Sequence, residues 1–315
     1  MQTHFDLGGA YLETTGAYAH NETFQATDSD SSNILLASFV APKIKSEYYS
    51  QEVRLLSATP GPLQWIVGAY AFHLNGDANF ILSSRTSPSV PLLVRTFDPV
   101  LKTTSYAGFA EATYEVVPKL FLTGGIRYTY EKRSFDQIVN GVSLFPATAR
   151  KSFDKVTYKG TIRYEISPRT NIYATYSTGF KSGVFNMTST APVAVEPEAI
   201  DALEGGIKSD ITPWLRVNLA LYHYKYKDLQ VTARDPLGPG YILQNAANAT
   251  IYGGELETTL APTSNFRIQG AIAYAHAEYD EFPAAQVFIP LPTGGNIVSQ
   301  ADVSGNRLPR TPRWT

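Results

Sequence analysis

Hydrophobic and polar residues alternate with a period of two along much of this 315-residue chain. Between residues 156 and 166 every second position, from Val156 to Ile166, is apolar, tyrosine or glycine, and the positions between them are polar or charged. Residues 120–131 repeat this pattern, with Phe121 as one interruption of the polar row. Because successive side chains of a strand point to opposite faces, the pattern predicts strands with one apolar and one polar face.

The connections between these segments are of two kinds that alternate along the chain. Short turns, each containing a proline, occur at residues 59–62, 117–119, 167–170, 211–213 and 261–265. Proline cannot donate a backbone hydrogen bond to a central ladder, so it marks the end of a strand. Long polar stretches separate the turns at residues 27–45, 76–100, 135–153, 185–196, 235–244 and 281–304.

This rhythm predicts an all-β fold, an antiparallel transmembrane β-barrel with short periplasmic turns and long extracellular loops. We count about eleven complete strands of roughly ten to fifteen residues, against about nine to eleven needed to cross a bilayer and five or six in a typical soluble strand. A soluble secreted β-sandwich also pairs one apolar with one polar face, and stays open as an alternative.

Aromatic residues cluster towards the segment ends, where the interfacial girdles of a barrel are expected. They are Tyr48, Tyr49, Trp65, Tyr70, Phe72, Tyr106, Tyr114, Tyr128, Tyr130, Trp214, Tyr222, Tyr224 and Tyr226.

Composition excludes several other classes. The 26 basic and 28 acidic residues nearly cancel, so no basic surface indicates a nucleic-acid partner. The absence of cysteine excludes disulfide scaffolds and thiolate zinc sites. No linker or composition shift divides the chain, and we expect one barrel domain over residues 1–315, incomplete at both ends. The N-terminus has no export signal, and residues 305–315 stop where a twelfth strand would begin.

The sequence contains no motif for catalysis, for a cofactor or for a metal, and it predicts a protein that is not an enzyme. Residues 28–33 resemble a calcium loop only weakly, because Asn33 replaces the required glycine, and we expect a solvated outer loop there. Charged residues in the polar rows are candidates for lining the lumen. These are Arg54, Glu111, Arg127, Lys159, Arg163, Glu165, Asp201, Arg216 and Glu255.

Several segments resemble, in order, the barrel of TonB-dependent outer-membrane receptors. They are residues 49–55 with 61–70, residues 171–183 with Asn186, residues 197–198 with 203–209, residues 245–257, and residues 304–306 with 308–309. Such receptors have about 22 strands, so the resemblance implies that this chain is about half of a barrel.

The resemblance also implies partners and a function. The intact relative carries an N-terminal plug domain, lies among outer-membrane lipid, and imports a scarce nutrient such as an iron–siderophore when the TonB complex pulls on the plug. The small-molecule ligand itself is not readable from the sequence. A passive porin-type barrel, which needs no plug, stays open as an alternative.

Overall fold

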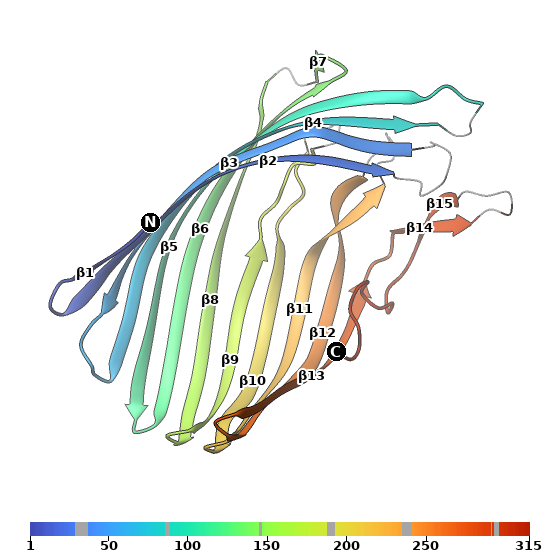
Figure 1. Cartoon of the computed structure of the whole chain (residues 1–315). Coiled ribbons are helices and arrows are strands. Elements are labelled where there is room, and N and C mark those ends of the chain that lie inside the picture. The colour runs from blue at the N-terminus through green and yellow to red at the C-terminus, as the bar shows by residue number, and fades with distance from the viewer. Residues whose placement is uncertain are drawn as a thin grey trace.

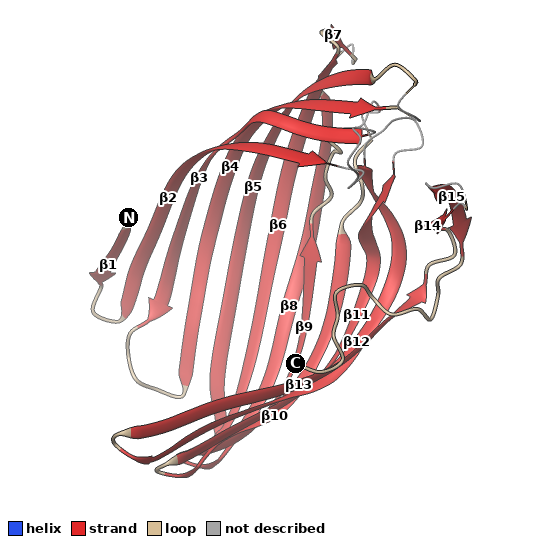
Figure 2. Ribbon diagram, turned by 45° about the vertical axis from the view of Figure 1, so that its right-hand side comes forward, coloured by secondary structure: helices blue, strands red, loops and turns tan. Residues whose placement is uncertain are grey.

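The computed structural model describes residues 1–28, 37–85, 89–144, 147–187, 193–234, 241–290, 292 and 296–315. Regular structure in these residues consists of antiparallel β-strands (Figures 1 and 2). No helix among the described residues is long and apolar enough to cross a membrane.

One sheet contains almost all of the strands, and each strand pairs with its neighbours in the chain. The order is β1 (Gln2–Asp6), β2 (Ala10–Asp28), β3 (Ala37–Ser57), β4 (Leu63–Ser84), β5 (Leu93–Val117), β6 (Leu120–Val139), β8 (Ala149–Ser167), β9 (Thr170–Lys181), β10 (Glu198–Thr212), β11 (Leu215–Arg234), β12 (Tyr241–Thr263) and β13 (Phe266–Glu281). The short β7 (Val142–Ser143) pairs with β6, while β14 (Ala285–Pro290) and β15 (Asn296–Ala301) form a separate hairpin. Figures 1 and 2 show the sheet as a curved wall, with β1 at one edge and β13 at the other.

The predicted turns are confirmed as tight connections between neighbouring strands. Between β5 and β6 only Pro118 and Lys119 lie outside the strands, and Lys119 adopts a positive φ of 73°. The carboxylate of Glu115 accepts a hydrogen bond from the backbone N–H of Lys119 at 2.8 Å, which stabilises this uncommon conformation. A further hairpin, β1–β2, turns at Gly8 (φ 87°) and was not predicted.

The strands are longer than predicted, so the predicted boundaries of the long loops are wrong. β5 has 25 residues and β4 has 22, and their pairing continues up to Ser84 opposite Leu93. Only about nine to eleven residues of each strand are needed to cross hydrocarbon. Beyond that length the apolar residues of β4, Ala78, Phe80 and Leu82, lie on the inward face, and backbone pairing continues, so the hairpins are longer than a membrane-spanning segment. Residues 29–36, which include most of the calcium-like segment, and parts of the other predicted loops lie outside the described residues.

The outward face carries the apolar rows predicted from the sequence. Ile126 and Ile162 are 56% and 47% exposed, and pairing places such residues side by side on neighbouring strands, as Leu122 lies opposite Ile162. Aromatic residues border this band at both ends. On β4, Trp65 lies near the turns and His73 lies eight residues further along, a distance of about 26 Å at roughly 3.3 Å per residue. A band about 25 Å tall is expected of an outer-membrane barrel.

Six of the aromatic residues that we expected in the girdles point to the other face. Side chains alternate between the two faces of a strand, and the exposed apolar residues of β3, β4 and β11 mark the outward face. By this alternation the inward face carries Tyr48, Tyr70, Phe72, Tyr222, Tyr224 and Tyr226. The prediction was wrong for these residues because position near a strand end does not determine the face.

The upper parts of β3, β4 and β5 have a small apolar core of their own. It consists of Ala41, Ala78, Phe80, Leu82 and Phe97. These strand ends bend over the open side of the wall in Figure 1.

The two edges of the sheet differ in their pairing. Along β13, Thr315 and Ala273 exchange two backbone hydrogen bonds of 3.0 and 3.1 Å, and Trp314 forms a bridge with Tyr274. The last residues therefore lie where the predicted next strand would be. The outer edge of the short β1 has no strand partner among the described residues. An unsatisfied backbone group costs several kcal/mol in hydrocarbon, so a free edge of this sheet would be unfavourable in a bilayer.

The β-sandwich alternative does not fit this architecture. A sandwich buries its apolar faces against a second sheet. In the described residues the apolar face of the single large sheet is exposed instead.

Neighbouring positions on β8 test which face contacts lipid. Ile162→Arg puts a cation on the apolar band and should lower the free energy of unfolding by roughly 2 to 4 kcal/mol. Thr161→Arg, the matched control on the other face, loses one hydroxyl hydrogen bond to Thr175 and should cost about 1 kcal/mol. Urea unfolding of the protein from lipid vesicles measures both values, and equal costs at the two positions would contradict the assignment of faces.

Candidate functional site

The inward face, opposite the apolar band, is the candidate functional surface. Pairing aligns its residues in rows across the strands, and one row runs through Arg54, Gly68, Phe109, Arg127 and Thr157 on β3 to β8. Eight of the nine predicted lumen residues lie on this face by register. They are Arg54, Glu111, Arg127, Lys159, Arg163, Glu165, Arg216 and Glu255.

The ninth residue, Asp201, departs from the prediction. It shares the outward face of β10 with Leu203, which is 54% exposed. Its carboxylate accepts hydrogen bonds from Lys227 at 3.0 Å and from the Tyr176 hydroxyl at 3.1 Å. The sequence did not reveal this because Asp201 lies near the upper end of β10, where polar residues occur on both faces.

A salt bridge between Glu111 and Lys159 crosses the inward face of an intervening strand. The Lys159 Nζ lies 2.6 Å from the Glu111 Oε2, although β6 separates the two strands. The residue between them in the row is Gly125, where a Cβ would lie 3.3 Å from the carboxylate. A glycine at this position therefore leaves the space in which the two charges meet. A shallow hollow of about 490 Å³ surrounds the pair.

The neighbouring cation, Arg127, interacts with aromatic rings. Its guanidinium lies 5.4 Å from the centre of the Phe109 ring and 5.6 Å from that of Tyr70. Cation–π contacts at such distances stabilise an arginine by about 0.5 to 1 kcal/mol at exposed sites. Arg127 Nε also donates to the Thr129 hydroxyl at 3.2 Å. Arg127 is therefore held flat against the wall rather than extended into the interior.

Most other predicted charges also have partners on this face. Arg54 binds Glu13 at 2.8 Å, and Arg216 binds Asp210 at 2.5 Å. The guanidinium of Arg163 forms an ion pair with Glu165 and lies 4.1 Å from the Phe121 ring. The stacking of Arg163 explains why Phe121 is tolerated in the polar row.

Inward residues that we did not predict extend this pattern. Glu131 and Arg133 form a 2.7 Å ion pair whose side chains are only 14% and 17% exposed. Tyr173 donates to Glu204 at 2.6 Å. Side chains of β6 and β9 alternate between the two faces as far as these positions. Counting every second residue along each strand would therefore have placed Glu131, Arg133 and Tyr173 on the inward face.

Three inward aromatic rings lie over glycines of the neighbouring strand. The directly opposed pairs are Phe109 with Gly68, Tyr173 with Gly206, and Tyr222 with Gly253. A Cβ on each glycine would meet ring carbons at 2.4, 2.9 and 2.9 Å, respectively. The rings thus cover the backbone of the glycines, which have no side chain of their own. Because each ring fits only over the glycine opposite it, these pairs also fix the register of the strands.

Two of the motif residues, Asn186 and Asn245, join separate segments of the chain near the upper ends of β9 to β12. Asn186 forms two hydrogen bonds with the backbone of Leu243, of 3.0 and 2.6 Å. Asn245 exchanges bonds of 2.7 and 2.9 Å with the backbone of Glu196. Asn245 also donates to the carbonyl of Asp228, a bulge residue with a φ of 56°.

The segment that contains Asn186 also contacts β6, which lies further along the sheet. The Phe185 ring stacks on Phe135 with centres 5.3 Å apart, and Gln137 donates to the carbonyl of Met187 at 2.7 Å. The chain between β9 and β10 is therefore fastened to β6 on one side and to β12 on the other.

The described residues contain no group of three or more metal-ligating side chains. The inward face instead offers paired charges, hydroxyls and aromatic rings. Such a surface suits contact with another polar protein domain or a polar solute.

Comparison with known proteins identifies relatives of this wall. Residues 2–315 match the family model described as TonB dependent receptor-like, beta-barrel. The pesticin receptor of Yersinia enterocolitica is 23% identical over 233 residues, which are 71% of this chain and 34% of that protein.

Two solved structures share the fold. The ferric yersiniabactin uptake receptor FyuA from Yersinia pestis gives a TM-score of 0.78 at 16% identity, covering 99% of this chain and 44% of that one. The siderophore receptor PiuA from Acinetobacter baumannii gives a TM-score of 0.74 at 19% identity, and the match covers 99% of this chain and 50% of that one. The chain thus spans half or less of the length of these relatives.

The pairs of aromatic ring and glycine predict a mutational asymmetry. In Gly253→Ala the new Cβ would lie 2.0 Å from the backbone oxygen of Tyr274, and Tyr222 would have to move as well. We expect the free energy of unfolding to fall by roughly 1 to 3 kcal/mol. Gly160→Ala is the control, because a Cβ there meets nothing within 4 Å. Urea unfolding in lipid vesicles gives both values, and a loss at Gly160 as large as at Gly253 would refute the role of the rings.

Proposed function

This chain belongs to the TonB-dependent receptor β-barrel family, and we propose that it forms one wall of an outer-membrane receptor that imports a nutrient by TonB-coupled transport. The wall would face outer-membrane lipid on one side and a plugged interior on the other. The observation that carries the proposal is a continuous sheet with an apolar outward face and a charge-paired inward face.

The dimensions of the sheet support a partial wall of a wide barrel. Receptors of this family have about 22 strands around a plugged lumen. In the described residues the main sheet has thirteen strands, twelve of them in one row from β1 to β13 and β7 paired with β6, and further pairing at its edges would close the barrel. We propose that residues 1–315 are one continuous part of such a barrel domain, with the plug and the remaining strands supplied by other parts of the protein.

The chemistry of the inward face supports a protein domain in the interior. A water-filled channel leaves charged side chains free to attract solutes, whereas here Glu111, Lys159 and Arg54 form ion pairs along the wall. Paired charges lower the cost of placing a polar domain against this surface. We therefore favour the plugged receptor over the passive porin-type barrel, and we propose the plug and the TonB complex as partners.

The names of the relatives support a class of cargo. The names of two of them specify ferric yersiniabactin uptake and a siderophore receptor. We propose an iron–siderophore complex as the class of ligand. It would bind at the extracellular end, where the long strands β2 to β4 bend over the open side of the wall and where Asn186 is hydrogen-bonded to Leu243.

Uptake of labelled iron tests this function. Cells producing the complete receptor that contains this chain, grown in iron limitation, should accumulate ⁵⁵Fe from its cognate siderophore, found by screening a panel. Accumulation should fall to the background of receptor-less cells when TonB is deleted or the proton gradient is collapsed.

A passive barrel gives a different result. Uptake that continues without TonB and without a proton gradient would identify a porin-type channel. No uptake from any siderophore of the panel, with the receptor present in the outer membrane, would overturn the proposed class of cargo.

A further inference from the structure

The inward face carries a segment that we call the inner strap. It consists of residues 182–187 and 193–197, which follow β9 and precede β10. Its Phe185 ring stacks on Phe135, which belongs to the inward row of β6, and both residues are at most 3% exposed. Because β8 lies between β6 and β9, the strap must pass over the inward side of β8 to make this contact.

On its other side the strap is held by two asparagines that act in opposite directions. Asn186 of the strap accepts a hydrogen bond from the backbone N–H of Leu243 at 2.6 Å and donates to the carbonyl of the same residue at 3.0 Å. On β12, Asn245 accepts from the backbone N–H of Glu196 in the strap at 2.7 Å and donates to its carbonyl at 2.9 Å. Each side-chain amide thus pairs with one backbone residue as a neighbouring strand would. We call these four bonds the asparagine clasp.

A third amide fills the space that the clasp crosses. β11 separates β10 from β12, and its Gln230 lies opposite Asn245 in the register. Gln230 Nε2 donates to the carbonyls of Ser182 and Glu196, at 3.0 Å each. The part of the strap that leaves β9 and the part that enters β10 are therefore both bonded to the neighbouring strands.

We propose that the asparagine clasp makes the inner strap a fixed part of the cargo site, which neither opens nor closes during uptake. Asn186 and Asn245 are then positioning residues, because they act on the cargo through the strap that they hold. The proposal rests on the proposed function, which places the cargo at this end of the wall.

The contacts favour a fixed strap over a moving lid. One hydrogen bond shifts an equilibrium by roughly fivefold, so the two bonds of one asparagine shift it by about 25-fold. Opening the strap would break both such pairs, the bonds of Gln230 and the stacking of two buried rings. A cargo can drive such a change only through a difference in its affinity for the two states. A strap that is already in place needs no such contribution from the cargo.

Hydrogen exchange measures the clasp directly, because the clasp binds the backbone N–H groups of Leu243 and Glu196. The complete receptor in lipid nanodiscs is measured with and without the ferric siderophore selected by the uptake screen. Both amides should exchange slowly in both conditions. Asn186→Ala should speed exchange of the Leu243 amide by roughly tenfold or more, and Asn245→Ala should do the same for the Glu196 amide. Amides that exchange freely until the siderophore is added would identify a closing lid and overturn the proposal.

Uptake by the double variant N186A/N245A tests the positioning role. Without the clasp a smaller fraction of receptors has the strap in place, so the half-saturating concentration of the ⁵⁵Fe-siderophore should rise by roughly fivefold or more. The maximal rate per receptor should stay the same. A half-saturating concentration equal to that of the parent would reject the positioning role.

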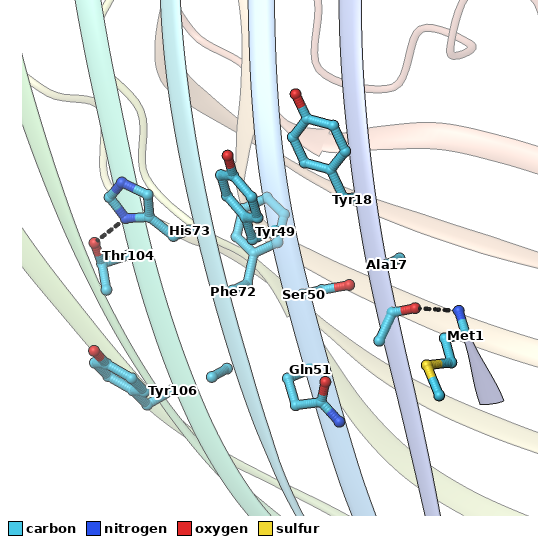
Figure 3. Close-up of a pocket in the computed structure, with 12 residues that line it drawn as sticks. Met1, Ala17, Tyr18, Tyr49, Ser50, Gln51, Phe72, His73, Thr104 and Tyr106 are labelled. Carbon is cyan, nitrogen blue, oxygen red and sulfur yellow. Dashed lines mark hydrogen bonds between the residues drawn. The ribbon is translucent and has the colours of Figure 1, made fainter. Parts of the chain in front are cut away.

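A matched control removes a hydrogen bond elsewhere on the wall. Thr104→Val deletes the 2.9 Å bond between His73 of β4 and Thr104 of the neighbouring β5, on the outward face (Figure 3). This variant should keep the half-saturating concentration, the maximal rate and the exchange of both amides. An effect as large as that of N186A/N245A would show that any lost bond between strands weakens uptake, which would refute a special role of the clasp.

A covalent bridge distinguishes a fixed strap from a gate. In the complete receptor, with any cysteine elsewhere replaced, the pair N186C/L243C is joined by a short bifunctional thiol reagent. Bridging should restore the half-saturating concentration of the parent and leave the maximal rate unchanged. Binding without uptake after bridging would show that the strap must move, and would overturn the proposal. If N186A/N245A does not reach the outer membrane, this pair before and after bridging gives the same comparison.

Failure of this inference differs from failure of the transport function. Uptake by the parent, with the same half-saturating concentration in N186A/N245A, rejects the fixed strap alone. No uptake by the parent from any siderophore of the panel rejects the proposed transport function. Exchange of the two amides without cargo then still decides whether the clasp holds the strap.

Discussion

Every backbone N–H and C=O of a strand that crosses hydrocarbon must have a hydrogen-bond partner within the protein, and this requirement shapes the whole chain. It explains why each long strand pairs along nearly its full length with both neighbours, and why the turns at one end are as short as Pro118 and Lys119. It also explains why the chain after β13 returns to pair with Ala273. The same constraint makes a wall with free edges unsuited to a bilayer, which is the physical basis for proposing a larger barrel.

The two faces of the sheet meet different surroundings and therefore differ in chemistry. The outward face needs only apolar side chains and girdle aromatics, since its solvent is lipid. The inward face is polar and must avoid uncompensated charge, and it does so by pairing across strands, as Lys159 and Glu111 do over Gly125. Rings over glycines, such as Phe109 over Gly68, fill the remaining surface and hold the register. Charges and rings are thus parts of one packed inner surface.

The period of two and the proline turns were enough to predict the long strands, their order and the polarity of their faces, but not β1 or the β14–β15 hairpin. They could not predict how far the hairpins extend, because towards Ser84 and Leu93 the apolar side chains, such as that of Phe80, lie on the inward face instead of the outward one. The face of Asp201 was misjudged at a depth where both faces are polar. Contacts such as Asn186 with Leu243 join residues far apart in the chain, and no local pattern encodes them.

The central claim is that one face of this sheet contacts lipid and the other does not. Residues 1–315 contain no cysteine, so in the complete receptor, with any cysteine elsewhere replaced, single cysteines at successive positions from residue 156 to residue 166 of β8 can each carry a fluorophore. Quenching by brominated lipids should alternate strictly, strong at positions such as Ile162 and Tyr164 and weak at Thr161 and Arg163. Uniform quenching along the strand, or the opposite alternation, would contradict the account.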